Sequence, residues 1–150
     1  MILYLDTSAL VKRYIAERGA TEVAAIIDQA GIVGTCIVTR AEMAAALAKA
    51  VRMSALSFAA ANAALQVFRS EWPQLVRVQI SEALVGRADT LAWELGLRGY
   101  DAVHLAAALL WQDGIGESVT FATFDLKQWQ AAGATGLVPA PTDLPALLAA

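Results

Sequence analysis

Four acidic residues stand where the chain is expected to enter a helix. Asp6 and Asp125 each follow a short apolar run, Glu42 falls in the first turn of a helix that follows another such run, and Asp101 opens an apolar helix. The carboxyl ends of parallel strands share one edge of a sheet, where ligands bind, so we expect the four side chains to converge. Carboxylates that close repel one another unless a cation lies among them. Oxygen ligands suit Mg²⁺ or Mn²⁺, ions that promote phosphodiester hydrolysis.

Each acid also has a purely structural interpretation. Aspartate is a common cap at a helix N-terminus, although Thr7 and Ser8 offer natural caps for the first helix. The spacing from Thr39 to Glu42 is that of a capping box, in which the glutamate bonds the amide of the cap. These interpretations explain each acid singly, but they do not explain why all four acids recur at the start of a helix.

The elements that must position these acids alternate between strand-like and helix-like patterns. Gly34 is a candidate bulge within the second strand, and Gly133 a candidate helix end. The alternation predicts an α/β fold of three layers, α/β/α, with a central, mainly parallel sheet in a single domain spanning 1–150. We expect strands at 2–5, 32–38, 75–80, 119–124 and 137–138, and helices at 9–14, 20–30, 39–53, 54–72, 81–95, 101–112, 126–132 and from 143.

The composition excludes several classes of protein. A hydrophobic fraction of 58% and a charged fraction of 17% are unlike a disordered chain. No segment approaches the roughly 18–20 apolar residues of a membrane span, and no secretion signal is recognisable. The single cysteine, Cys36, excludes an internal disulfide. We therefore expect a cytoplasmic protein without a membrane partner.

The net charge of −3 argues at first against a nucleic-acid partner. Four of the fourteen acidic residues belong to the proposed site, however, and the other ten face eleven Lys and Arg. The surface outside the site is therefore close to neutral, and attraction of a phosphate backbone would be local. The basic residues nearest the proposed edge in sequence are Lys12, Arg13, Arg40, Arg98 and Lys127.

The order of the motifs resembles that of the PIN-domain ribonucleases, most closely the VapC-type toxins of toxin–antitoxin pairs. The resemblance covers residues 2–138 and rests on four pieces. They are Leu5-Asp6-Thr7-Ser8-Ala9-Leu10, Thr39-Arg40-Ala41-Glu42, Tyr100-Asp101-Ala102-Val103-His104-Leu105-Ala106-Ala107-Ala108, and Thr123-Phe124-Asp125 followed by Gly133. It implies a PIN-like fold, metal-binding acids at Asp6, Glu42, Asp101 and Asp125, and a catalytic-site hydroxyl at Thr123.

The same resemblance implies what the protein does and with what. It points to an Mg²⁺- or Mn²⁺-dependent endoribonuclease that leaves a 5′-phosphate, forms a homodimer and is held inactive by a cognate antitoxin. The alanine-rich segment 39–72 is expected to form a helical hairpin, either packed internally or receiving an amphipathic partner helix. His104, one turn after Asp101, is interpreted as a core or supporting group rather than a general base.

Two other functions remain open at this point. A PIN-like module that binds RNA or protein without cutting would tolerate loss of the acids, and none is lost here. A phosphatase of the haloacid-dehalogenase type requires a second aspartate two residues after the first, where this chain has Ser8. The nuclease is therefore the best interpretation, with the non-catalytic module as the alternative.

Overall fold

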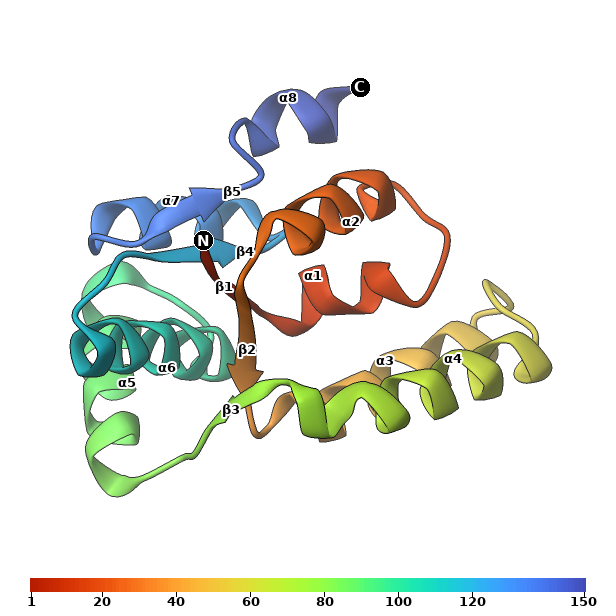
Figure 1. The fold of residues 1–150 in the computed structure, drawn as a ribbon, viewed down its shortest axis with the longest axis horizontal. Helices are drawn as coiled ribbons and strands as arrows, with labels where there is room; N and C mark the ends of the chain where they lie inside the picture. Colours follow the sequence, from red (N-terminus) through yellow and green to blue (C-terminus); the bar gives the residue numbers. More distant parts are fainter.

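A five-stranded, all-parallel sheet forms the centre of the protein (Figure 1). The structure, a computed structural model, describes all 150 residues. The strands run in the order β3-β2-β1-β4-β5, so that β1 is paired on both sides. Their carboxyl ends therefore share one edge. The strands are β1 (Ile2–Leu5), β2 (Ile32–Cys36), β3 (Val76–Val78), β4 (Val119–Ala122) and β5 (Val138–Ala140).

Helices cover both faces of the sheet and confirm the predicted three-layer α/β/α fold. One face carries α1, α2 and α4, and the other carries α5, α6 and α7 (Figure 1). None of the helices is long and apolar enough to cross a membrane. The helices are α1 (Thr7–Leu10), α2 (Ala20–Gln29), α3 (Thr39–Arg52), α4 (Phe58–Glu71), α5 (Glu82–Leu95), α6 (Gly99–Ile115), α7 (Leu126–Ala134) and α8 (Leu144–Ala149), with short 3-10 turns η1 (Val11–Arg13) and η2 (Trp72–Gln74).

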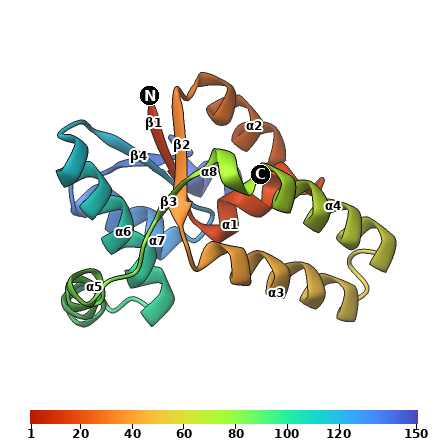
Figure 2. The ribbon, with the colours of Figure 1, turned by 60° about the horizontal axis from the view of Figure 1, so that its bottom comes forward.

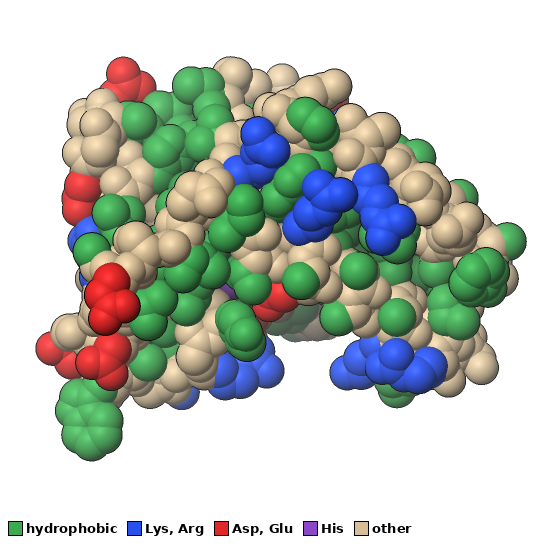
Figure 3. Space-filling model, turned by 90° about the horizontal axis from the view of Figure 1, so that it is seen from below, with side chains coloured by type: hydrophobic (Ala, Val, Ile, Leu, Met, Phe, Trp, Pro, Cys, Tyr) green, Lys and Arg blue, Asp and Glu red, His purple; other side chains and the backbone are tan.

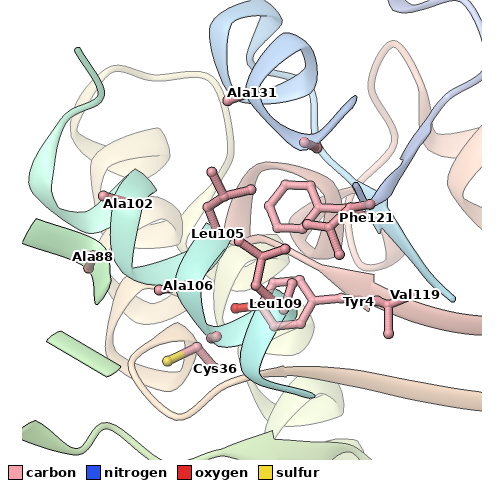
Figure 4. Close-up of a cluster of buried hydrophobic side chains, with 14 of the residues drawn as sticks. Tyr4, Cys36, Ala88, Ala102, Leu105, Ala106, Leu109, Val119, Phe121 and Ala131 are labelled. Carbon is pink, nitrogen blue, oxygen red and sulfur yellow. The ribbon is translucent and has the colours of Figure 1, made fainter. Parts of the chain in front are cut away.

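Successive residues of β1 point to opposite faces of the sheet, and both faces are buried. Leu3 and Leu5 pack in the core beneath α1, α2 and α4, whereas Tyr4 packs in the core beneath α6. The Tyr4 ring stacks on that of Phe121 with centroids 5.2 Å apart, and Leu105 of α6 lies close by (Figure 4). This double burial explains why 2–5 is a continuous apolar run.

Helix α6 is the central helix that its apolar sequence predicts, and seven of its residues are buried. It begins at Gly99, however, with extended Arg98 before it, so the prediction that Asp101 opens the helix is wrong by two residues. Asp101 instead lies in the first turn, where a negative charge interacts favourably with the helix N-terminus.

Two glycine predictions are also wrong. Gly34 lies in uninterrupted parallel register with Tyr4 and Val76, so β2 has no bulge there. A Cβ at this position would lie 2.8 Å from the Trp111 ring, and glycine is needed because α6 approaches the strand so closely. Gly133 lies inside α7, which ends at Ala134, rather than ending it.

The alanine-rich segment forms the expected helical hairpin of α3 and α4, which extends away from the sheet (Figure 2). The second helix begins at Phe58 rather than at Ser54, because Ser54 has a positive φ of 58° and Ser57 caps the helix. Leu47, Ala61 and Ala64 are buried between the two helices, so these three side chains serve internal packing. Phe58 is 74% exposed at the far end.

Candidate active site

A pocket opens at the carboxyl edge of the sheet, where β1 and β4 end and where α3, α6 and α7 begin. All four acids predicted from the sequence line it, so the fold brings them to one place. Seen from this side, acidic side chains lie in a hollow with basic side chains around it (Figure 3). The lining residues are Asp6, Thr7, Ser8, Glu42, Arg98, Asp101, His104, Phe124 and Asp125.

Asp6 caps α1 and is nearly fully buried. Its Oδ1 accepts hydrogen bonds from the Ser8 hydroxyl at 2.6 Å and from the Ala9 amide at 3.1 Å. Thr7 and Ser8, the expected caps, do not cap the helix. Burial raises the pKa of Asp6, although His104, Ser8, Thr123 and Ala9 partly offset the effect. No basic side chain forms an ion pair with Asp6, so its charge is left for another cation to balance.

Glu42 points into the pocket and does not form the capping box suggested by its spacing. The N-cap of α3 is Val38, without a side-chain bond, and the Thr39 hydroxyl lies 2.7 Å from that of Thr35. Glu42 Oε1 instead accepts from Thr7 Oγ1 at 2.7 Å and lies 2.6 Å from His104 Nε2. Burial opposes ionisation, but His104 and Thr7 outweigh it and lower the pKa of Glu42. The carboxylate is therefore held as an anion.

Arg98 bridges the remaining two acids. Its Nε lies 2.9 Å from Asp101 Oδ2, and its Nη2 lies 3.3 Å from Asp125 Oδ2. These contacts raise the pKa of Arg98, first through its hydrogen bond to Asp101. Its side chain is 79% exposed, so the ion pairs are weak and readily exchanged. Asp125 also caps α7 by accepting a hydrogen bond from the Gln128 amide, as its structural interpretation predicts.

Thr123 is fully buried and does not line the pocket. Its Oγ1 accepts from the Asp125 amide at 3.2 Å and lies 3.3 Å from Ser8 Oγ. Ser8 Oγ in turn accepts from the Phe124 amide at 2.9 Å. The two hydroxyls thus tie the end of β4 to the start of α1 and fix the segments that carry Asp6 and Asp125.

The residues present fit a divalent cation in donor chemistry. Four carboxylates line one pocket, and hard oxygen donors are what Mg²⁺ and Mn²⁺ prefer. No three of the acidic, histidine or cysteine side chains, however, already lie close enough together to hold an ion. Arg98 supplies the positive charge between Asp101 and Asp125 in this arrangement.

Of the basic residues singled out from the sequence, only Arg98 lines the pocket. Lys12 pairs with Glu17, Arg13 pairs with Glu71, and the Lys127 ammonium bonds the carbonyl of Gly96. Arg40 lies beside the Trp72 ring. Neither the ion pairs of Arg98 nor the contact between His104 and Glu42 was predicted from the sequence. The three-residue spacing from Arg98 to Asp101 could have signalled the first of these ion pairs.

Comparison with known proteins agrees with this architecture. The model of the PIN domain family matches residues 3–133. Two curated relatives come from Mycobacterium tuberculosis. They are "Ribonuclease VapC45" of strain CDC 1551 / Oshkosh and "Ribonuclease VapC49" of strain ATCC 25618 / H37Rv. Each is 31% identical to this chain over 143 residues, which cover 95% of this chain and 97% of the relative.

Two solved structures share the fold. One is described as "Toxin-antitoxin complex from Klebsiella pneumoniae", with a TM-score of 0.63 at 22% identity over 92% of this chain and 96% of the other. The second is PAE2754 from Pyrobaculum aerophilum, with a TM-score of 0.61 at 22% identity over 100% and 97%. The chain belongs to the PIN-domain family and is related over nearly its whole length to ribonucleases of the VapC type.

Proposed function

We propose that this protein is a metal-dependent endoribonuclease that hydrolyses RNA phosphodiester bonds as the toxin of a toxin–antitoxin pair. The observation that carries the proposal is the convergence of Asp6, Glu42, Asp101 and Asp125 on one open pocket. The ribonuclease names of the two relatives support the reaction type. A non-catalytic module has no need of four intact carboxylates in one pocket.

The proposed division of labour follows from the contacts of each residue. Asp6, Glu42, Asp101 and Asp125 would hold Mg²⁺ or Mn²⁺, which when bound makes water more acidic and stabilises negative charge on phosphate oxygens. Thr123 acts with Ser8 by fixing the segments that carry Asp6 and Asp125. Arg98 lies at the exposed rim, where its guanidinium can bind a phosphate once it leaves the acids.

The proposed partners are RNA, a cognate antitoxin and a second copy of the chain, all in the cytoplasm. The α3–α4 hairpin carries an apolar groove, lined among others by Val51, Phe58 and Leu65, that suits an amphipathic helix. The structure described as a toxin–antitoxin complex shares the fold. Val85 and Tyr100, on α5 and α6, are exposed apolar side chains suited to the homodimer contact.

The decisive experiment is RNA cleavage by the purified protein with Mg²⁺ or Mn²⁺, with and without EDTA. We expect cleavage by the wild type, loss in EDTA, and at least a 100-fold lower rate for Asp6→Asn, on the scale of losing a main charge-stabilising group. Asp28→Asn makes the same chemical change on the exposed face of α2 and should cleave normally. Cleavage that survives Asp6→Asn would contradict the proposal, and RNA binding without cleavage would favour the non-catalytic module.

A further inference from the structure

Two buried side chains connect the core to Glu42 in a line of hydrogen bonds. The Tyr4 hydroxyl lies 2.7 Å from Nδ1 of His104, and Nε2 of His104 lies 2.6 Å from Oε1 of Glu42. Tyr4 is fully buried in β1, and His104 is 2% exposed in α6. The line therefore runs from the middle of the sheet to the wall of the pocket.

The charges at the two ends fix which ring nitrogen carries a proton. A glutamate is ordinarily ionised at neutral pH. Its carboxylate only accepts hydrogen bonds, so Nε2 of His104, 2.6 Å from Oε1 of Glu42, must donate. Burial raises the pKa of Tyr4 well above its usual value, so its hydroxyl keeps its proton. In the neutral imidazole that hydroxyl donates to Nδ1, and this bond favours the tautomer with the proton on Nε2.

Both hydrogen bonds to Glu42 fall on the same carboxylate oxygen. Thr7 Oγ1 and His104 Nε2 approach Oε1 from different elements, one from α1 and one from α6. Oε2 accepts no hydrogen bond from the protein, and Glu42 lines the pocket. The carboxylate is thus held by one oxygen and offers the other.

We propose that Tyr4 and His104 are positioning residues, which act through Glu42 to hold its Oε1 and present its Oε2 to the cation of the site. The inference rests on the proposed metal-dependent function. A histidine that merely fills the core needs hydrogen-bond partners for its ring nitrogens, but any polar group would serve. A partner that is an ionised carboxylate in the wall of a pocket therefore favours a positioning role. Groups that orient a ligating carboxylate through hydrogen bonds commonly contribute 10–100-fold to metal affinity.

The test compares side chains that keep or lose the Nε2 donor. In His104→Gln the amide nitrogen reaches about as far as Nε2 and can still donate a hydrogen bond to Glu42. In His104→Asn the amide reaches only the position of Nδ1, so the hydrogen bond to Glu42 is lost. Binding of Mn²⁺ to each folded variant is measured by titration calorimetry. We expect affinity within about threefold of wild type for His104→Gln and a loss of about tenfold or more for His104→Asn.

Tyr4→Phe removes only the outer bond and keeps the ring that stacks on Phe121. We expect a smaller loss of Mn²⁺ affinity, about threefold. The matched control is Tyr14→Phe, which changes a half-buried tyrosine outside the pocket and should leave the affinity unchanged. Should His104→Asn fail to fold, Tyr4→Phe carries the test with this control.

A spectroscopic measurement reads the geometry directly and does not depend on metal. The chain has one histidine, so ¹⁵N NMR of the ring nitrogens reports His104 without overlap. We expect Nε2 to carry a proton in the metal-free wild type. A ring protonated on Nδ1 alone would overturn the inference.

The outcomes separate this inference from the proposed function. Normal Mn²⁺ affinity in His104→Asn and in Tyr4→Phe, or equal loss in the Gln and Asn variants, overturns the positioning role while leaving metal-dependent cleavage intact. A wild type that neither binds Mn²⁺ nor cleaves RNA overturns the proposed function, and the positioning role falls with it.

Discussion

Replacing Asp6 by asparagine should stabilise the metal-free protein while it abolishes activity. An ionised carboxylate loses several kcal/mol of hydration on burial. Asp6 is 4% exposed and has no ion pair to compensate. Its two shortest bonds, from Ser8 and Ala9, are each about 1 kcal/mol stronger to a charged acceptor than to a neutral one. The Asp6→Asn variant would therefore lose about 2 kcal/mol of hydrogen-bond strength, but it avoids the larger cost of burying an ionised carboxylate.

The expected net gain is about 1–2 kcal/mol in the free energy of unfolding at neutral pH in EDTA. For a chain of this length, that corresponds to a rise of about 3–6 °C in Tm. Asp28→Asn, on the exposed face of α2, serves as the control and should stay within about 0.5 kcal/mol of wild type. Tm is measured by circular dichroism and the free energy by urea unfolding.

The advantage of Asp6→Asn should depend on pH in a defined direction. The pKa of Asp6 is raised in the folded state, so the folded protein binds this proton more tightly than the unfolded chain does. Below the ordinary pKa of about 4 the acid is neutral in both states and the variant has little advantage. The advantage grows as the pH rises from there to the folded pKa and is complete above it.

Mg²⁺ should narrow or reverse the difference between the two proteins, because it binds the folded wild type and not the variant. Two results would refute the reasoning. One is a wild type that is more stable than Asp6→Asn at pH 8 in EDTA. The other is a difference in stability that does not change with pH.

Two further predictions concern Arg98 and Gly34. Arg98→Gln removes the cation that lies between Asp101 and Asp125. Calorimetry should then show Mn²⁺ binding about two- to fivefold tighter, which is the range expected for the loss of exposed ion pairs. Unchanged or weaker binding would mean that Arg98 does not compete with the ion for the two acids. Gly34→Ala would place a Cβ 2.8 Å from the Trp111 ring and should lower the free energy of unfolding by about 1–3 kcal/mol in urea. The control is Gly86→Ala, because Gly86 lies in a helix with open space around it. This change should raise the free energy of unfolding by up to about 1 kcal/mol. Equal effects of Gly34→Ala and Gly86→Ala would contradict the packing argument.

The sequence predicts the layers of this fold well because the strong signals are local. The run 2–5 is apolar throughout and becomes the central strand, and 101–112 is strongly apolar apart from Asp101, His104 and Gln112 and lies within the central helix. Helix ends were predicted less well. Ser54 was expected to start a helix, but it has a positive φ and the helix starts after Ser57. The prediction failed because both serines are residues that commonly cap a helix, and the sequence does not show which of them does so.

The convergence of the four acids follows from parallel strands sharing one edge, and that much could be anticipated. The partners of Glu42 could not, because contacts between distant segments leave no periodic signal in one sequence. Glu42 and His104 are 62 residues apart, and Tyr4 and His104 are 100 apart. The spacing from Thr39 to Glu42 even favoured a local bond that the structure does not make.

The order in which the chain is synthesised has a consequence for the site. Asp6 follows β1 and is made well before β4, the strand that pairs with β1 and begins at Val119, and Asp125 follows that strand. A growing chain therefore cannot assemble the set of four acids until β4 and Asp125 have left the ribosome. A chain that carries only Asp6, Glu42 and Asp101 lacks both a neighbouring strand of β1 and the fourth acid, so the pocket is completed late in synthesis.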